Sequence, residues 1–251
     1  MVILMSSEHL AHIQKGDLGE VTLIVGDPDR VALISKDWES KRKIEDSREF
    51  VLVVGMFRGH HVSVCSTGMG VGSTEICVVE LIENGAKQII RCGGCGAWRD
   101  DINPGDIIIN RAMARTSGLM GDYVPDSYPA VADPLLVNKI YTGAVKNGFR
   151  VYTGIGLTTE TYFFGQYRQP DISETALKVD GAKMKFWQDR GIINAEMESA
   201  VLFLLGSLYN IPVANCLVVH LSRATYKWEK PEDYNRIHQR SAESVLESVL
   251  G

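Results

Sequence analysis

The sequence predicts an α/β domain in which helices flank a central mixed β-sheet, and three observations support this. Several short apolar runs rich in β-branched residues are bounded by turn residues, as is typical of strands that are covered on both faces. Segments with the apolar spacing of helices lie between these runs. The chain of 251 residues contains no internal repeat and no linker-like stretch, so residues 1–251 are expected to form one domain.

The predicted strands and helices alternate along the chain. Strands are expected at residues 21–25, 61–65, 88–92, 106–109 and 212–219. Helices are expected at residues 73–84, 197–208 and 242–250. Gly85 is a good stop for the first of these helices, and the other two repeat apolar side chains at helical spacing. Residues 111–133, with two glycines and two prolines, are expected to form a long loop.

Charge and composition exclude several classes of protein. The chain has 26 Lys and Arg against 31 Asp and Glu, a net charge of −5, so neither nucleic acid nor an anionic membrane is an expected partner. No apolar run approaches the roughly 18 residues of a membrane span, and the opening run is too short for a signal peptide. The five widely spread cysteines are expected to be reduced thiols of a cytoplasmic protein.

Two arginines near the ends of predicted strands indicate an anion site. Gly26 ends a strand, and Arg30 lies one turn inside the helix expected from Pro28, where backbone N–H groups and a guanidinium can bind an anion. A plain turn with a solvated arginine also explains this segment. Arg91 ends an apolar strand, where a charge is costly unless it meets an anion. Both arginines are expected at the ligand-binding edge of the sheet.

Two glycine-rich segments are interpreted as turns that let the backbone approach a ligand. Residues 65–73 contain Gly68 and Gly70, but Ser73 stands where a dinucleotide fingerprint needs glycine or alanine. Residues 91–97 contain a single Cys-x-x-Cys pair. Without a second pair, structural thiols are favoured over a zinc or redox site.

Two further segments carry groups suited to a sugar and a flat base. Glu196 and Glu198 precede a predicted helix, where they either interact with its dipole or accept hydrogen bonds from a sugar diol. Residues 162–168 combine aromatic rings with an amide and a guanidinium. This set can stack on a base and bind its edge, and a packed loop is the alternative explanation.

Together and in this order, these segments resemble the nucleoside phosphorylase family, which includes uridine phosphorylases and hexameric purine nucleoside phosphorylases. The resemblance runs from about His9 to about Arg223. Its most specific pieces are residues 26–30, residues 66–70, the segment after Arg91, and residues 196–198. Residues 164–168, Phe-Gly-Gln-Tyr-Arg, look like the signature of the uridine phosphorylases.

The resemblance implies a role for each candidate site residue. The residues implied to hold phosphate are Gly26, Arg30, Arg91 and, from a neighbouring subunit, Arg48. Those implied to hold the ribose are Met197, Glu198 and, from the neighbour, His9, with His12 as a competing assignment. Glu196 is also counted among the substrate-binding residues. Those implied to bind the base are Tyr162, Gln166, Arg168 and Arg223. Catalysis is implied to rest on Arg30, Arg91, Glu198 and Arg223.

Gly94 departs from the family pattern. The phosphate loop usually carries Ser or Thr at this place, so the resemblance implies one missing hydroxyl contact, and Gly94→Thr is expected to improve phosphate binding. Some uridine phosphorylases also hold potassium between subunits, and the matching residues here are Glu49 and Ser73. No other cofactor is implied, because inorganic phosphate is the co-substrate.

The function implied is phosphorolysis of uridine to uracil and ribose 1-phosphate, by a homodimer or a hexamer with shared sites. A purine nucleoside or methylthioadenosine phosphorylase is the first alternative. Residues 210–232 lack the aspartate that purine members use to protonate the base, although residues 224–228 look closer to some protozoan purine enzymes. The second alternative is a non-catalytic nucleoside-binding relative, which Gly94 favours and the arginines oppose.

Overall fold

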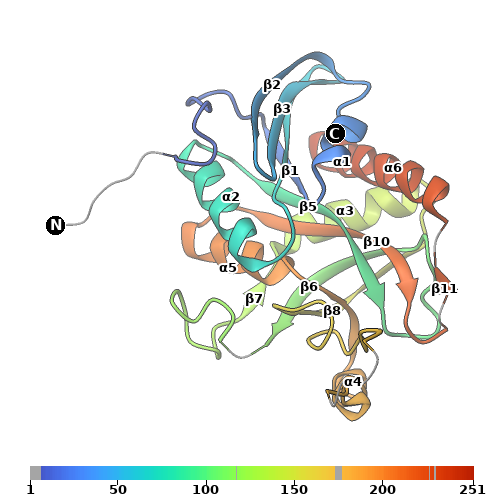
Figure 1. Ribbon diagram of the computed structural model, residues 1–251. Helices are drawn as coiled ribbons and strands as arrows, with labels where there is room; N and C mark the ends of the chain where they lie inside the picture. Colours follow the sequence, from blue (N-terminus) through green and yellow to red (C-terminus); the bar gives the residue numbers. More distant parts are fainter. Residues whose placement is uncertain (1–6, 117, 173–176, 226, 229) are drawn as a thin grey trace.

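The computed structural model describes residues 7–116, 118–172, 177–225, 227–228 and 230–251, and one mixed 11-stranded sheet runs through them with helices on both sides (Figure 1). The strands are β1 (Val21–Val25), β2 (Glu39–Ser47), β3 (Phe50–Phe57), β4 (His60–Ser66), β5 (Ile89–Ala97), β6 (Ile107–Arg115), β7 (Ala130–Val131), β8 (Val151–Thr158), β9 (Ile192–Glu196), β10 (Val213–Ser222) and β11 (Lys227–Trp228). The helices are α1 (Pro28–Ile34), α2 (Val71–Glu83), α3 (Pro134–Lys146), α4 (Gly181–Gln188), α5 (Ser199–Tyr209) and α6 (Pro231–Leu250). The predicted α/β fold with a central mixed sheet is confirmed.

The sheet closes on itself around β5. Its strand order is β11-β10-β6-β8-β9-β5-β1-β4-β3-β2, with β7 beside β6, and β10 pairs with β5 as well as with β6. The strands β5, β9, β8, β6 and β10 therefore form a closed ring. β5 is parallel to β1 and β10 and antiparallel to β9. Because Ala97 pairs with Asn194 and Gly96 with Ala195, β9 runs back along the second half of β5, and its end lies beside that half.

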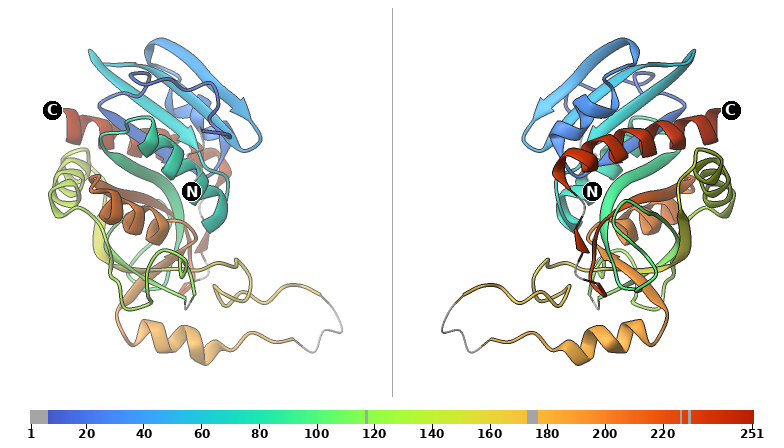
Figure 2. Two further views of the ribbon diagram at one scale, coloured as in Figure 1. Left: turned by 90° about the vertical axis from the view of Figure 1, so that its left-hand side faces the viewer. Right: turned by 90° about the vertical axis from the view of Figure 1, so that its right-hand side faces the viewer.

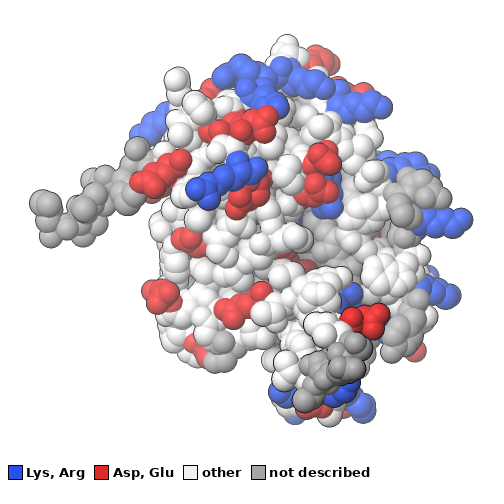
Figure 3. All heavy atoms as spheres, in the orientation of Figure 1, with Lys and Arg blue, Asp and Glu red and all other residues white. Residues whose placement is uncertain are grey.

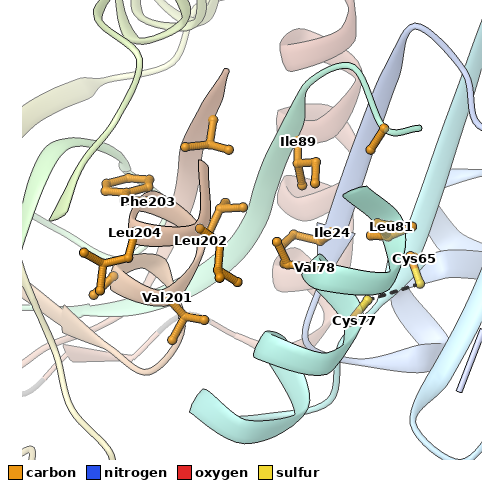
Figure 4. Packing of buried hydrophobic residues seen from close by; sticks show 14 of the residues in the cluster. Ile24, Cys65, Cys77, Val78, Leu81, Ile89, Val201, Leu202, Phe203 and Leu204 are labelled. Atoms are coloured by element: carbon orange, nitrogen blue, oxygen red, sulfur yellow. Dashed lines mark hydrogen bonds between the residues drawn. The ribbon is translucent and has the colours of Figure 1, made fainter. Parts of the chain in front are cut away.

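Two hydrophobic layers hold the sheet between the helices. In β1, Ile24 faces the layer under α2 and α5, whereas Leu23 faces the layer under α1, α3 and α6. This alternation is expected for a strand buried on both faces. Figure 4 shows Val78 of α2 and Leu202 of α5 on the same side of the sheet as Ile24 and Ile89.

The strongest sequence patterns predicted the elements correctly, and most of these elements are longer than the patterns. The strands expected at residues 88–92, 106–109 and 212–219 extend as β5, β6 and β10. The expected loop at residues 111–133 is wrong at both ends, because Arg111–Arg115 continues β6 and Ala130–Val131 forms β7. β2 escaped prediction because its exposed face is charged, which interrupts any apolar run.

The glycine-rich segment at residues 91–97 is a strand, which corrects its interpretation as a turn. Its glycines make room for side chains. A Cβ at Gly93 would lie 2.7 Å from Cζ of Arg91, and a Cβ at Gly94 would lie 2.0 Å from Cε1 of His220. Real Cβ atoms essentially never come this close. The glycines of β5 therefore serve the packing of two polar side chains rather than a change of chain direction.

The outer surface of the molecule carries α4 and mixed charged side chains. Figure 2 shows α4 at one end of the molecule, away from β2 and β3. On the face shown in Figure 3, positive and negative side chains lie interspersed, with Lys and Arg gathered at the end that carries β2. Among the helices of the described residues, none has both the length and the apolar character needed to cross a bilayer.

Candidate active site

A cavity of about 830 Å³ lies where β1, β4, β5, β9 and β10 end. This volume is typical of a pocket for a small organic ligand. The predicted site residues that line it are Gly26, Arg30, Glu49, Ser73, Arg91, Gly94, Tyr162, Gln166, Arg168, Glu196, Met197 and Glu198. The predicted residues that do not line it are His9, His12, Arg48 and Arg223. The fold thus brings segments far apart in the sequence to one pocket, at the sheet edge where ligands of α/β proteins bind.

Arg30 and the start of α1 form one wall of this cavity. Asp27 caps α1 by accepting a hydrogen bond from the backbone N–H of Asp29 at 3.0 Å. This cap and the proline at position 28 fix the turn after Gly26, which places Arg30 at the cavity. The Arg30 side chain is 11% exposed, its Nη2 donates to the Tyr234 hydroxyl at 3.2 Å, and the Asp27 carboxylate is 4.0 Å away. Within the described residues Arg30 therefore has no carboxylate nearer than 4.0 Å, which suits it to a bound anion.

Arg91 is buried in β5 and held by two carboxylates. Its Nε lies 3.2 Å from Oε2 of Glu196, and its Nη2 pairs with Oε2 of Glu198. Burial opposes the charged guanidinium, but the two carboxylates outweigh this effect and raise the pKa of Arg91. Its Nη1 is buried without a partner among the described residues. A buried donor without an acceptor costs about 1–3 kcal/mol, which a bound anion can recover.

Glu196 and Glu198 divide the two roles that the sequence left open. Oε2 of Glu196 accepts from the backbone N–H groups of Glu198 at 2.9 Å and Ser199 at 2.8 Å, which caps the start of α5. Glu198 instead accepts at Oε1 from the backbone N–H of Gly70 at 2.7 Å and pairs with Arg91. Burial raises the pKa of the Glu198 carboxyl, although Arg91 opposes this rise. Glu198 is thus the carboxylate suited to ligand hydroxyls.

Tyr162, Gln166 and Arg168 gather on another wall of the cavity. Cζ of Arg168 lies 4.3 Å from the ring centroid of Tyr162, and its Nε lies 3.4 Å from Oε1 of Gln166. Gln166 is only 4% exposed, whereas Tyr162 is 44% exposed. Burial lowers the pKa of Arg168, and the positive charge of Arg223 adds to this effect. Within the described residues no carboxylate pairs with Arg168, so the donors that do not reach Gln166 are available to a ligand.

Arg223 binds the backbone of the segment that forms this wall. Its Nη1 donates to the backbone carbonyl of Gln166 at 3.2 Å, and its Nη2 donates to that of Tyr167 at 2.9 Å. Tyr167 has a φ of 55°, a backbone conformation that is unfavourable for a bulky residue unless its surroundings hold it. Arg223 therefore fixes the segment that presents Gln166 and Arg168. A direct contact between Arg223 and a base stays a prediction.

The three residues expected to serve a neighbouring subunit lie outside the cavity of their own chain. Nδ1 of His9 is 3.0 Å from Oε1 of Glu80, and Nδ1 of His12 is 2.9 Å from Oε2 of Glu45. Arg48 is exposed in the turn between β2 and β3. The choice between His9 and His12 stays open.

Glu49 and Ser73 lie together beside Gly68 at the rim of the cavity. A Cβ at Gly68 would lie 2.8 Å from Cγ of Glu49 and 3.2 Å from Oγ of Ser73, so only glycine leaves both side chains in place. The hydroxyl of Ser73 also donates to the backbone carbonyl of Met69 at 3.3 Å. One carboxylate and one hydroxyl fit the oxygen ligands that hard cations take, and a full coordination shell needs oxygens from elsewhere.

The lining residues to which the sequence interpretation gave no site role include His220, Trp228 and Tyr234. His220 carried a signal of the same kind as Arg91, because it is a polar residue at the end of an apolar strand. β10 has a bulge at this position, since Val219 pairs with Cys95 and Leu221 pairs with Gly96. Bulges of this kind redirect a side chain beside a site. Tyr234 carried no comparable signal, and Trp228 was noted only as part of residues 224–228. Tyr226 of that segment lies outside the described residues.

The chain is similar to known enzymes over most of its length. A family model described as the phosphorylase superfamily matches residues 20–250. Uridine phosphorylase of Haemophilus influenzae is 35% identical over 205 residues, which are 81% of this chain and 81% of that protein. Uridine phosphorylase of Thermococcus kodakarensis is 34% identical over 222 residues, 88% of this chain and 79% of that protein. The crystal structure of uridine phosphorylase from Vibrio fischeri with 6-hydroxy-1-naphthoic acid matches with a TM-score of 0.83 at 25% identity, covering 98% of this chain and 96% of that one.

Substitutions at Gly94 test how closely the ring of His220 packs against β5. A side chain at this position would collide with the ring of His220, which argues against the expected benefit of Gly94→Thr. We expect Gly94→Ala to lower the free energy of unfolding by about 1–3 kcal/mol, the usual cost of overpacking. Gly96→Ala is the matched control in the same strand, because its Cβ would meet its nearest neighbour at an ordinary 3.4 Å. Urea unfolding of both variants measures this difference, and equal stabilities would contradict the packing described here.

Proposed function

Since the chain belongs to the phosphorylase superfamily, we propose that it catalyses the reaction of uridine with inorganic phosphate to give uracil and ribose 1-phosphate. The observation that carries this proposal is the arrangement of one cavity with three chemically distinct walls. Arg30 and Arg91 suit phosphate, Glu198 suits the ribose hydroxyls, and Gln166 with Arg168 suits the edge of a base.

The reaction follows from this arrangement. An oxygen of phosphate attacks the anomeric carbon of the ribose while the bond from that carbon to the base nitrogen breaks. The transition state resembles an oxocarbenium cation, which the negative phosphate stabilises, and the arginines hold the phosphate in place. The electrons of the broken bond leave with the base as negative charge. Arg168, which has no carboxylate partner in the described structure, faces that charge.

The base wall favours uracil. A uracil ring offers two carbonyl oxygens and one N–H at its edge, which an amide and a guanidinium complement. The amino group of cytosine would face arginine donors in a buried pocket, and unpaired polar groups of this kind discriminate strongly between substrates. We therefore place uridine ahead of cytidine, and we propose a role in the salvage of pyrimidine bases.

We further propose that the enzyme is a homo-oligomer, a dimer at least and a hexamer by resemblance, in which Arg48 completes the phosphate site of a neighbour. Arg48 is exposed and has a φ of 56°, an unfavourable conformation for arginine that clusters at functional positions. The proposed reaction uses no metal or organic cofactor. All five cysteines are buried free thiols, which supports a cytoplasmic location.

Base release from a panel of nucleosides, with and without phosphate, tests the proposed function. We expect uracil release from uridine only when phosphate is present, because phosphate is the nucleophile. Inosine, adenosine and cytidine are expected to react much more slowly. Release without phosphate would indicate a hydrolase, and faster release from inosine or adenosine would favour a purine enzyme.

Replacing Arg168 tests the base wall. We expect Arg168→Ala to lower kcat/KM for uridine by about 10- to 100-fold, the value of a hydrogen bond to a charged group, and to leave the KM for phosphate nearly unchanged. Arg190→Ala is the control, since Arg190 is exposed over Phe186 and outside the cavity. A loss of phosphate affinity as large as the loss for uridine would contradict this assignment.

Mixed oligomers test the sharing of sites. If Arg48 serves the neighbour, a dimer of one Arg48→Ala subunit and one Arg168→Ala subunit has one intact site and one site with both defects. Random mixing of two impaired variants is then expected to restore about a quarter of wild-type activity. Mixing Arg30→Ala with Arg168→Ala is the control, because both residues line the cavity of their own chain and no intact site can form. Equal activities of the two mixtures would show that Arg48 is not shared.

A further inference from the structure

A chain of hydrogen bonds links the buried interior of α6 to Arg30 at the cavity. Nε2 of His238 lies 3.0 Å from Nε2 of His220, and Nδ1 of His220 lies 3.0 Å from the hydroxyl of Tyr234. The Tyr234 hydroxyl in turn accepts from Nη2 of Arg30 at 3.2 Å. Tyr234 and His238 are four residues apart on α6 and therefore share the face that meets His220. Three of these four hydrogen-bonded residues line the cavity: His220, Tyr234 and Arg30.

His220 and His238 are both neutral. Burial, with the positive charges of Arg30, Arg91 and Arg168, lowers the pKa of His220 to about 3. Burial also lowers the pKa of His238, and the charge of Arg30 adds to this effect. A neutral imidazole carries one N–H, so one nitrogen of each ring donates and the other accepts.

Two hydrogen-bond directions satisfy these contacts. In the first, Tyr234 donates to His220, His220 donates to His238, and the remaining hydrogen of His238 sits on its Nδ1. In the second, His238 donates to His220, His220 donates through Nδ1 to the oxygen of Tyr234, and the hydroxyl hydrogen of Tyr234 is left for another acceptor. The two directions differ in which end of the chain holds an unpaired hydrogen.

The structure favours the second direction. Nδ1 of His238 is buried without a partner among the described residues. Buried N–H groups without an acceptor are rarer in proteins than acceptors without a donor, so this nitrogen is better left unprotonated. The oxygen of Tyr234 then accepts from both Arg30 and His220, which uses its two lone pairs. Its hydrogen must find an acceptor in the cavity that Tyr234 lines.

We infer that the Tyr234 hydroxyl donates a hydrogen bond to an oxygen of the phosphate that Arg30 holds, and that His220 and His238 are positioning residues that orient this hydroxyl. The inference rests on the proposed function, which makes phosphate the anion at Arg30. Gly94 is required for this arrangement, because any side chain there would occupy the space of the His220 ring. A neutral side-chain donor is thereby added beside the charged guanidinium groups of Arg30 and Arg91.

Tyr234→Phe tests the inference, since it removes the hydroxyl and keeps the ring that packs 5.6 Å from Cζ of Arg30. We expect its KM for phosphate to rise about tenfold or more, the effect of losing a hydrogen bond to a charged group, with the KM for uridine nearly unchanged. Tyr152→Phe is the matched control, because its hydroxyl bonds the carbonyl of Asp101 at 2.7 Å away from the cavity. Calorimetric titration with inorganic phosphate alone is expected to show the same loss of affinity in Tyr234→Phe.

A double-mutant cycle tests the positioning role. We expect His220→Phe to weaken phosphate binding in the wild-type background and to add nothing in the Tyr234→Phe background, because it acts through that hydroxyl. Independent, multiplicative effects would overturn the role of His220. An active Tyr234→Phe enzyme with the wild-type KM for phosphate would overturn the role of Tyr234 and leave the proposed function standing. A wild-type enzyme that releases no uracil with phosphate would instead overturn the proposed function and, with it, the identity of the anion.

Discussion

The buried ion pairs of Arg91 with Glu196 and Glu198 are the constraint on which the rest of the site depends. A buried arginine without partners is strongly destabilising, so β5, which carries Arg91, must meet the segment between β9 and α5. The same contact places the cap of α5 and the carboxylate of Glu198 side by side. This electrostatic requirement therefore keeps two walls of the cavity next to each other.

The glycines of β5 are the second condition, because the polar side chains that pack against this strand need space. Gly93 and Gly94 leave room for the guanidinium of Arg91 and the ring of His220, at the cost of the stability that larger residues would give a strand. The bulge in β10 aims His220 into this space. β5 therefore lacks the packing of larger side chains at two positions, and this leaves Arg91 and His220 in place at the cavity.

The sequence predicted the fold and most of one site, and the reasons for its failures are physical. β1 and β10 are buried on both faces, so their apolar runs could be recognised in the sequence. The charged, exposed residues of β2 interrupt any apolar run, so this strand was not predicted. Single-chain motifs identified Arg30, Arg91 and Gln166, because each stands in a recognisable local segment. Tyr234 was missed because its role depends on a contact between α6 and β10, which no local pattern encodes. The turn expected at residues 91–97 failed for the same reason, since the partners of its glycines lie elsewhere in the chain.

The distribution of charge in the cavity explains why a neutral donor is useful there. Arg91 is already compensated by two carboxylates, and a further cation beside Arg30 and Arg168 would repel them. His220 illustrates this repulsion, because burial first and then the charges of the surrounding arginines lower its pKa and keep it neutral. A hydroxyl oriented by neutral imidazoles supplies a hydrogen bond without adding charge. In the proposed reaction, the phosphate keeps the negative charge with which it stabilises an oxocarbenium-like transition state, while the arginines fix its position.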